Sequence, residues 1–163
     1  MFRAFARVAL KNNAVLVKVG LPRQPQRTDL VDLAGKLGIR DRVVFIDSVS
    51  EEKLPFIYGA ADALVLPSFY EGFGLPPLEA MACGTPVIVS NTTSLPEVVG
   101  DAGVYVEPTD ESGIAAAISR VLEDFALREE LQIKGRARAA QFAWKRTIDG
   151  LLRVYERAIT SAR

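Results

Sequence analysis

Short apolar runs alternate with amphipathic stretches up to about residue 110, and this alternation constrains the fold more than any other feature of the sequence. Runs without a polar face are typical of parallel strands buried on both sides. Because the stretches between the runs carry a helical pattern, the order predicts an α/β fold with a Rossmann-like parallel sheet and helices on both faces. The five predicted strands are Val15–Val19, Val43–Ile46, Ala63–Leu66, Val87–Val89 and Val104–Val106.

Start and stop signals place helices between these strands. One helix is expected at residues 28–37, ended by Gly38, and another after Ser50, which would act as its N-cap. A third is expected to begin near Pro76, because proline suits a first helical turn, and to stop before Gly84.

Beyond about Asp110 the pattern is helical only. We therefore expect a single domain over residues 1–163 in which residues 111–163 form a mainly helical tail. The basic run Lys134–Arg138 is interpreted as a solvated helix face. The last helical segment places six apolar residues along one face: Trp144, Ile148, Leu151, Leu152, Tyr155 and Ile159.

Composition excludes several kinds of chemistry. The chain has no histidine, which removes Ser-His, Cys-His and His-metal sites. Lys plus Arg equals Asp plus Glu at 20 each, so no basic excess favours a nucleic-acid partner. The single Cys83 cannot form an internal disulfide and is expected to be a small core residue.

The sequence also predicts a cytoplasmic location. No apolar run approaches the roughly 20 residues that cross a bilayer. The first residues lack a secretory pattern because Arg3, Arg7 and Lys11 interrupt it.

The stretch Pro67–Pro86, which reads PSFYEGFGLPPLEAMACGTP, follows a predicted strand and runs into a helix. In open α/β sheets, ligands bind beyond the carboxyl ends of the strands. Gly72 and Gly74 would let the main chain approach a ligand, and the helix start offers unpaired N–H groups to a phosphate or sugar oxygen. Glu71 and Glu79, eight residues apart, are placed to accept hydrogen bonds from hydroxyl groups.

This stretch resembles the signature of the retaining glycosyltransferases of family 4, which have two Rossmann-like domains in the GT-B arrangement. The C-terminal domain of that family carries a Glu-x7-Glu motif, which Glu71 and Glu79 match. The resemblance covers almost the whole chain. It includes DRVVFIDSVSEEKLPFIYGAADALVLPS upstream, EGFGLPPLEAMACGTPVIVS, SLPEVVGDAG at Ser94–Gly103, VEPTD at Val106–Asp110 and FAW at Phe142–Trp144.

The resemblance implies a nucleotide-sugar donor site that needs no metal or other cofactor. Glu71 would contact the hydroxyls of the donor sugar at the catalytic position, and Glu79 would bind the ribose. The other implied donor-binding residues are Gly72, Phe73, Gly74 and Leu75 at the sugar and diphosphate, and Ser48, Val49 and Leu54 near the base. The hexosyl unit would pass to a glycan, lipid or other hydroxyl acceptor with retention of configuration and without a protein nucleophile.

The family pattern also contains parts that this sequence lacks. These are an N-terminal acceptor domain and a first strand whose loop carries an Arg and a Lys that grip the diphosphate; neither Arg3 nor Arg7 matches them. We expect the isolated chain to bind nucleotide sugar weakly and to transfer nothing. Further expected partners are the N-terminal domain, the inner membrane face through that domain, and a second copy through the 144–159 face.

Three other interpretations stay open. The chain could belong to a GT-B phosphorylase or a nucleotide-sugar epimerase, or it could be a free-standing nucleotide-binding or interaction domain. A flavodoxin-like signalling receiver is a weaker alternative, because the sequence lacks the acidic cluster at strand ends and the switch lysine that such a domain needs.

Overall fold

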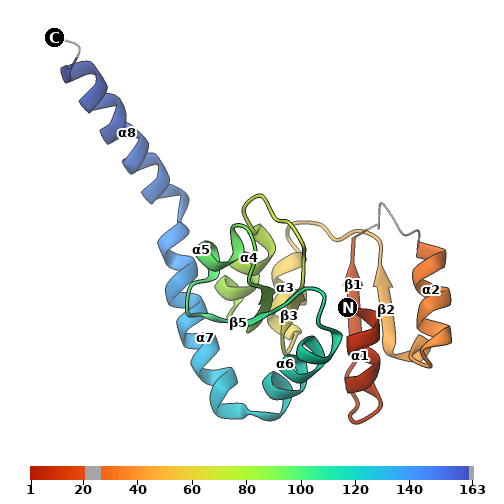
Figure 1. The fold of residues 1–163 in the computed structure, drawn as a ribbon. Helices are drawn as coiled ribbons and strands as arrows, with labels where there is room; N and C mark the ends of the chain where they lie inside the picture. Colours follow the sequence, from red (N-terminus) through yellow and green to blue (C-terminus); the bar gives the residue numbers. More distant parts are fainter. Residues whose placement is uncertain (21–26, 162–163) are drawn as a thin grey trace.

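The computed structural model describes residues 1–20 and 27–161 and has the predicted α/β fold (Figure 1). The predicted strand Val43–Ile46 matches the observed one, and each of the other four differs from its prediction by one residue at one end. The strands are β1 (Leu16–Val19), β2 (Val43–Ile46), β3 (Leu64–Leu66), β4 (Val87–Ser90) and β5 (Gly103–Val106). The helices are α1 (Phe2–Ala9), α2 (Arg27–Lys36), α3 (Leu54–Ala60), α4 (Leu75–Cys83), α5 (Leu95–Val99), α6 (Glu111–Glu123), α7 (Phe125–Ala139) and α8 (Trp144–Ser161), with 3₁₀ turns η1 (Arg40–Arg42) and η2 (Ala140–Phe142).

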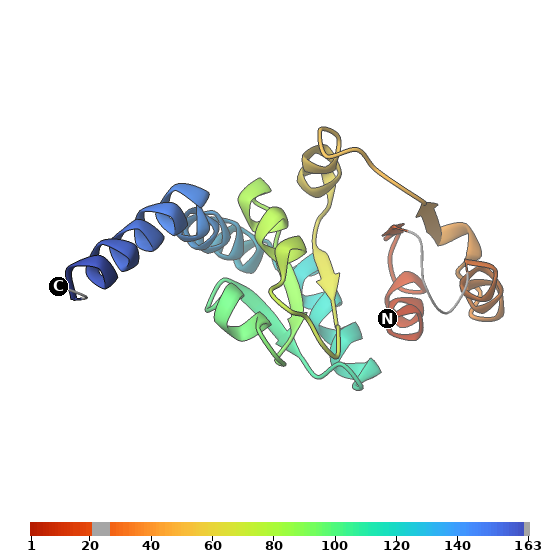
Figure 2. The ribbon, with the colours of Figure 1, turned by 90° about the horizontal axis from the view of Figure 1, so that it is seen from above.

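Every strand pairing is parallel, as predicted, but the described strands form two sheets instead of one. β1 pairs with β2, and β3, β4 and β5 form a second sheet in that order. β1 lies on the side of its sheet that faces β3, as both views show (Figures 1 and 2). β1 and β3 therefore each have one edge without a described strand partner, and the two edges belong to neighbouring sheets.

The three-stranded sheet has helices on both faces. β4 is buried along its whole length. Val87 and Val89 pack with α4 and α5 on one face, while Ile88 packs with α1, α6 and α7 on the other. The expectation of a strand buried on both sides is confirmed here, because successive side chains of a strand point to opposite faces.

The two-stranded sheet is covered on one face only. Helices α1 and α2 pack against it through Phe2, Phe5, Leu30 and Ala34. On the strands themselves Val17 is 45% exposed and Val44 47% exposed. The prediction that all strands are buried on both sides is wrong for β1 and β2, because no described element covers their second face.

Helix ends follow the glycine signals more closely than the capping signal. α2 ends two residues before Gly38, whose φ is +69°, and α4 ends at the residue before Gly84, whose φ is +81°. The predicted N-cap at Ser50 is wrong. The N–H groups of Lys53 and Leu54 donate to the Ser50 carbonyl at 2.9 and 3.1 Å, so a hydrogen-bonded turn comes first and α3 begins only at Leu54.

The tail is helical as predicted. α6 and α7 pack on the three-stranded sheet, whereas α8 projects away from it (Figure 1). No residue of α8 is buried, and Trp144 at its start is 79% exposed. No helix in residues 1–20 and 27–161 combines the length and the apolar character needed to span a membrane.

The N-cap of α6 provides a stability test. The Asp110 carboxylate accepts hydrogen bonds from the N–H groups of Ser112 and Gly113 at 3.0 and 2.9 Å. Asp110→Ala leaves these donors unpaired and is expected to lower the free energy of unfolding by about 1 kcal/mol, or the Tm by roughly 2–4 °C. Thermal and urea unfolding measure this. Asp62→Ala, which removes an exposed aspartate without a described partner, is the control; equal losses in both variants would contradict the capping role.

Candidate functional site

The loop between β3 and α4, residues 67–74, is called the glycine loop here. It leaves the carboxyl end of β3 and enters α4 at Gly74, the N-cap, whose φ is +104°. A side chain at Gly74 would be strained by this left-handed conformation, and its Cβ would lie 3.0 Å from Leu95. A Cβ at Gly72 would meet no protein atom within 4 Å. The backbone therefore requires glycine at Gly74, while Gly72 leaves open space above the loop.

The start of α4 presents a row of open amides. Pro76 and Pro77 have no N–H, so the available donors are the amides of residues 72–75. Within residues 1–20 and 27–161, none of these four N–H groups donates to a protein acceptor. Unpaired donors at the positive end of a helix are the kind of groups that bind anions, so the anion site expected from the sequence stays a prediction at this loop.

Glu71 lies in the glycine loop and is half-buried. Its N–H donates to Thr93 Oγ1 at 3.2 Å, and its carbonyl accepts from Ser94 Oγ at 3.0 Å. In the described part of the chain its carboxylate takes part in no ion pair. The main chain of Glu71 is thus fixed while its carboxylate stays available.

Glu79 lies in the middle of α4 and is exposed. Its carboxylate accepts a hydrogen bond from the Tyr58 hydroxyl on α3 at 3.0 Å. Thr85, two residues after the end of α4, adds a second contact with α3, because its hydroxyl donates to the Tyr58 carbonyl at 2.6 Å. Burial and the neighbouring Glu79 carboxylate raise the pKa of Tyr58, so the phenol remains a donor to Glu79 at neutral pH.

Of the three residues predicted near the base, only Leu54 lies on an element that is hydrogen-bonded to Glu79. Leu54 is the first residue of α3, the helix that contacts Glu79 through Tyr58. Ser48 is exposed and Val49 half-buried in the segment after β2, which lies on the same side of the molecule as the glycine loop (Figure 1). Among the described residues, no hydrogen bond or ion pair links Ser48 or Val49 to Glu71 or Glu79.

The cations near the start of the chain are engaged elsewhere. Arg3 lies 3.7 Å from Glu111, and Arg7 donates to Ser112 Oγ at 2.7 Å, so both hold α1 against the start of α6. Over the ranges that the structure describes, no three His, Cys, Asp or Glu side chains come together as a metal site. Cys83 is half-buried with a free thiol.

The sequence interpretation missed the last residue of β4 and the turn that follows it, residues 90–94, together called the hydroxyl turn here. All four hydroxyls bind the main chain of the glycine loop: those of Ser90 and Thr92 at the Ser68 carbonyl, and those of Thr93 and Ser94 at Glu71 and Phe73. The sequence does carry a sign of this turn. The run SNTTS at residues 90–94 begins at the last residue of a buried strand and contains four hydroxyl side chains, which readily bind nearby backbone.

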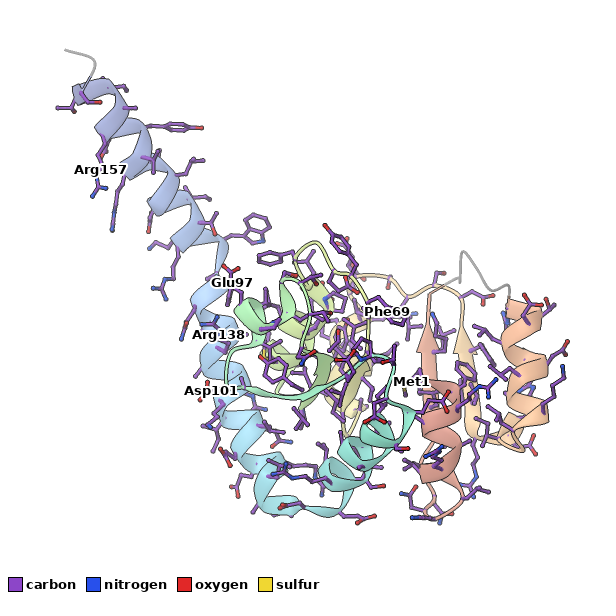
Figure 3. All side chains as sticks on the ribbon, viewed as in Figure 1. Met1, Phe69, Glu97, Asp101, Arg138 and Arg157 are labelled. Carbon is purple, nitrogen blue, oxygen red and sulfur yellow. The ribbon has the colours of Figure 1, made fainter. Side chains whose placement is uncertain are left out.

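The interpretation of Arg138 as part of a solvated face is wrong. Its guanidinium donates to the carbonyls of Glu97 and Val98 in α5 and lies 4.9 Å from the centre of the Phe142 ring. Phe142 in turn meets the Phe73 ring edge-on, with centroids 6.0 Å apart. Figure 3 shows Arg138 of α7 beside Glu97. Packing therefore connects the C-terminal helices to the glycine loop.

Comparison with known proteins identifies the family. The family model described as glycosyl transferases group 1 matches residues 1–138. The chain belongs to this family. It is 49% identical over 112 residues to O-antigen chain mannosyltransferase B of Escherichia coli, an alignment that covers 69% of this chain and 29% of that protein. The chain therefore spans less than a third of the length of that relative.

Solved glycosyltransferase structures share the fold. Sucrose-phosphate synthase from Thermosynechococcus elongatus matches with a TM-score of 0.84 and 32% identity, over 98% of this chain and 42% of that chain. HepE from Anabaena, solved in complex with UDP-glucose, matches with a TM-score of 0.83 and 23% identity, over 96% of this chain and 44% of that chain. The chain therefore shares the α/β fold of GT-B glycosyltransferase structures.

The raised pKa of Tyr58 gives a pH test. A folded-state pKa above the unfolded value of about 10 stabilises the protein below that pH, and this contribution is lost as pH rises above it. In urea unfolding from about pH 9 to 11, the wild type is expected to lose stability more steeply than Tyr58→Phe. Tyr70→Phe, which removes an exposed phenol, is the matched control. Equal slopes for wild type and Tyr58→Phe would rule out the Tyr58 effect.

Proposed function

We propose that this chain forms the nucleotide-sugar donor site of a retaining glycosyltransferase of family 4. The observation that carries the proposal is the row of open amides at residues 72–75, with Glu71 before it and Glu79 one turn into α4. Membership of the group 1 family and the GT-B framework support it. The HepE complex makes UDP-glucose the first ligand to test.

Each part of the donor has a matching group. The open amides and the positive end of α4 are suited to the diphosphate, whose oxygens accept hydrogen bonds and carry negative charge. Glu79 offers a carboxylate to two vicinal ribose hydroxyls, already oriented by Tyr58. The carboxylate of Glu71 is suited to the hydroxyls of the sugar. The residues after β2 and at the start of α3, Ser48, Val49 and Leu54, would border the base.

The transfer itself needs an acceptor. The acceptor oxygen bonds to the anomeric carbon on the face from which the diphosphate leaves, and its proton passes to the departing diphosphate oxygen, so configuration is retained. The open amides stabilise the charge that builds on this leaving group. Glu71 stabilises the positive charge on the sugar electrostatically. No protein nucleophile and no metal take part in this scheme.

A second domain completes the scheme, since the chain spans 29% of its mannosyltransferase relative. We propose that this second domain binds the acceptor, which is a glycan, lipid or other hydroxyl compound. We also propose that it contacts the inner face of the membrane from the cytoplasm. The unpaired edges of β1 and β3 also suit a further parallel strand between them. The resulting order, β2-β1-new-β3-β4-β5, would be the doubly wound order with the new strand first in sequence.

The second candidate function is a nucleotide-binding or interaction domain without catalysis. The observation that favours it is the exposed apolar face of α8, which packs on nothing in the described chain. Nucleotide-sugar binding that depends on Glu79 separates the donor site from a pure interaction domain.

Glu79→Ala tests the donor site. Loss of the hydrogen bonds that the ribose hydroxyls would donate to the Glu79 carboxylate is expected to raise the Kd about 10- to 100-fold for the tightest ligand among UDP-glucose, GDP-mannose and ADP-glucose. Chemical-shift titration of the chain measures this. Glu129→Ala removes an exposed helical glutamate without a described partner and is the control. Equal affinity of Glu79→Ala and wild type would refute the assignment, and so would the absence of binding by the wild type.

We also propose that the apolar face of α8 mediates self-association of the isolated chain. Ile148 is one of the six apolar residues of this face and is 54% exposed. Ile148→Glu places a charge there and is expected to shift the sedimentation profile toward monomer, because burying an unpaired charge is costly. Arg153→Glu alters the opposite face of α8 and is expected to sediment like the wild type. A wild-type chain that stays monomeric throughout the accessible concentration range would contradict the proposal.

A further inference from the structure

The hydroxyl turn contacts the glycine loop through main-chain atoms, and Ser94 makes two of these contacts. Its Oγ lies 3.0 Å from the carbonyl oxygen of Glu71 and 2.9 Å from that of Phe73. The single proton of this hydroxyl is therefore shared between the carbonyl oxygens of Glu71 and Phe73, on the two sides of Gly72. These carbonyls belong to the peptide groups 71–72 and 73–74.

The direction of a carbonyl fixes the direction of its amide. In a planar trans peptide, the C=O and the N–H of the same group point in opposite directions. Because Ser94 holds the carbonyls of Glu71 and Phe73 toward the hydroxyl turn, the N–H groups of Gly72 and Gly74 point away from it. Among the described residues neither N–H has a protein acceptor. The N–H groups of Gly72 and Gly74 are thus both directed away from the hydroxyl turn and free to bind a ligand.

We propose that Ser94 is a positioning residue for the donor, which holds the amides of Gly72 and Gly74 toward the anionic oxygens of the diphosphate or its sugar end. This rests on the proposed function. Ser94 does not touch the donor in this account; it acts through the two peptide groups. Preorganised amides bind such an oxygen without having to be reoriented during the reaction.

The other contacts of Ser94 support a role toward the loop. Ser94 occupies the N-cap of α5, but its side chain makes no capping hydrogen bond there. Its hydroxyl therefore serves the loop and not the helix. The preceding residue, Thr93, has a φ of +53°, which is unfavourable for a threonine and persists where the surroundings hold it. Thr93 Oγ1 also accepts a hydrogen bond from the N–H of Glu71, which fixes the same residue of the loop from its other side.

The test compares ligands with and without the groups that the amide pair would hold. UDP-glucose carries the distal phosphate and the sugar, whereas UMP carries neither. Ser94→Ala is expected to raise the Kd for UDP-glucose about tenfold and to leave the Kd for UMP within about twofold. Thr92→Ala is the matched control, because it removes a hydroxyl of the same turn whose contact with the glycine loop, at the Ser68 carbonyl, lies outside the peptide groups 71–72 and 73–74. If the chain prefers guanine, GDP-mannose and GMP replace this pair.

The wild-type chain provides a second measurement that does not depend on a variant. With ¹⁵N-labelled chain, UDP-glucose is expected to shift the amide protons of Gly72 and Gly74 together, and UMP to shift neither. Binding of UDP-glucose without these shifts would overturn the proposal. Equal loss of UDP-glucose and UMP affinity in Ser94→Ala would also overturn it, because that pattern indicates general damage.

A failure of the donor site and a failure of the Ser94 proposal give different results. Glu79→Ala is expected to weaken UDP-glucose and UMP alike, since both contain the ribose. If neither nucleotide sugar binds the wild type, the donor site is refuted. The rate of amide hydrogen exchange in the ligand-free chain then tests whether Ser94 holds the loop. Ser94→Ala is expected to speed exchange of the Glu71 N–H about fivefold by loosening the loop; unchanged exchange refutes the contact.

Discussion

The site depends on how the chain passes from the glycine loop into α4. Gly74 takes a left-handed conformation, and two prolines follow in the first turn, so the helix begins with donors only at residues 72–75. A capping side chain would satisfy one of these donors, but none is present. The helix start is left open, and an anionic ligand is the partner that such a start favours.

Contacts from distant parts of the sequence hold this opening in shape. Ser94 and Thr93 fix the main chain of the glycine loop from the turn after β4. Phe73 is packed edge-on against Phe142, and Arg138 joins Phe142 to the end of α5. The C-terminal helices are thus in contact with the glycine loop, and a shift in their position would change the packing of Phe73 in that loop.

The sequence predicts the strands, the helix ends at Gly38 and Gly84, and the glycine loop, because each depends on local residue patterns. It does not reveal the role of Ser94, whose partners lie 21 and 23 residues away and are main-chain atoms with no side-chain signature. The error at Arg138 has the same origin, since its acceptors lie 40 and 41 residues away. The exposed faces of Val17 and Val44 could not be foreseen either, because burial depends on which neighbours are present.

A crystal structure of the chain with UDP-glucose tests the central claim most directly. We expect diphosphate or sugar oxygens about 3 Å from the amide nitrogens of residues 72–75, with the ribose at Glu79. A nucleotide bound elsewhere on the chain, with these amides facing solvent, would contradict it.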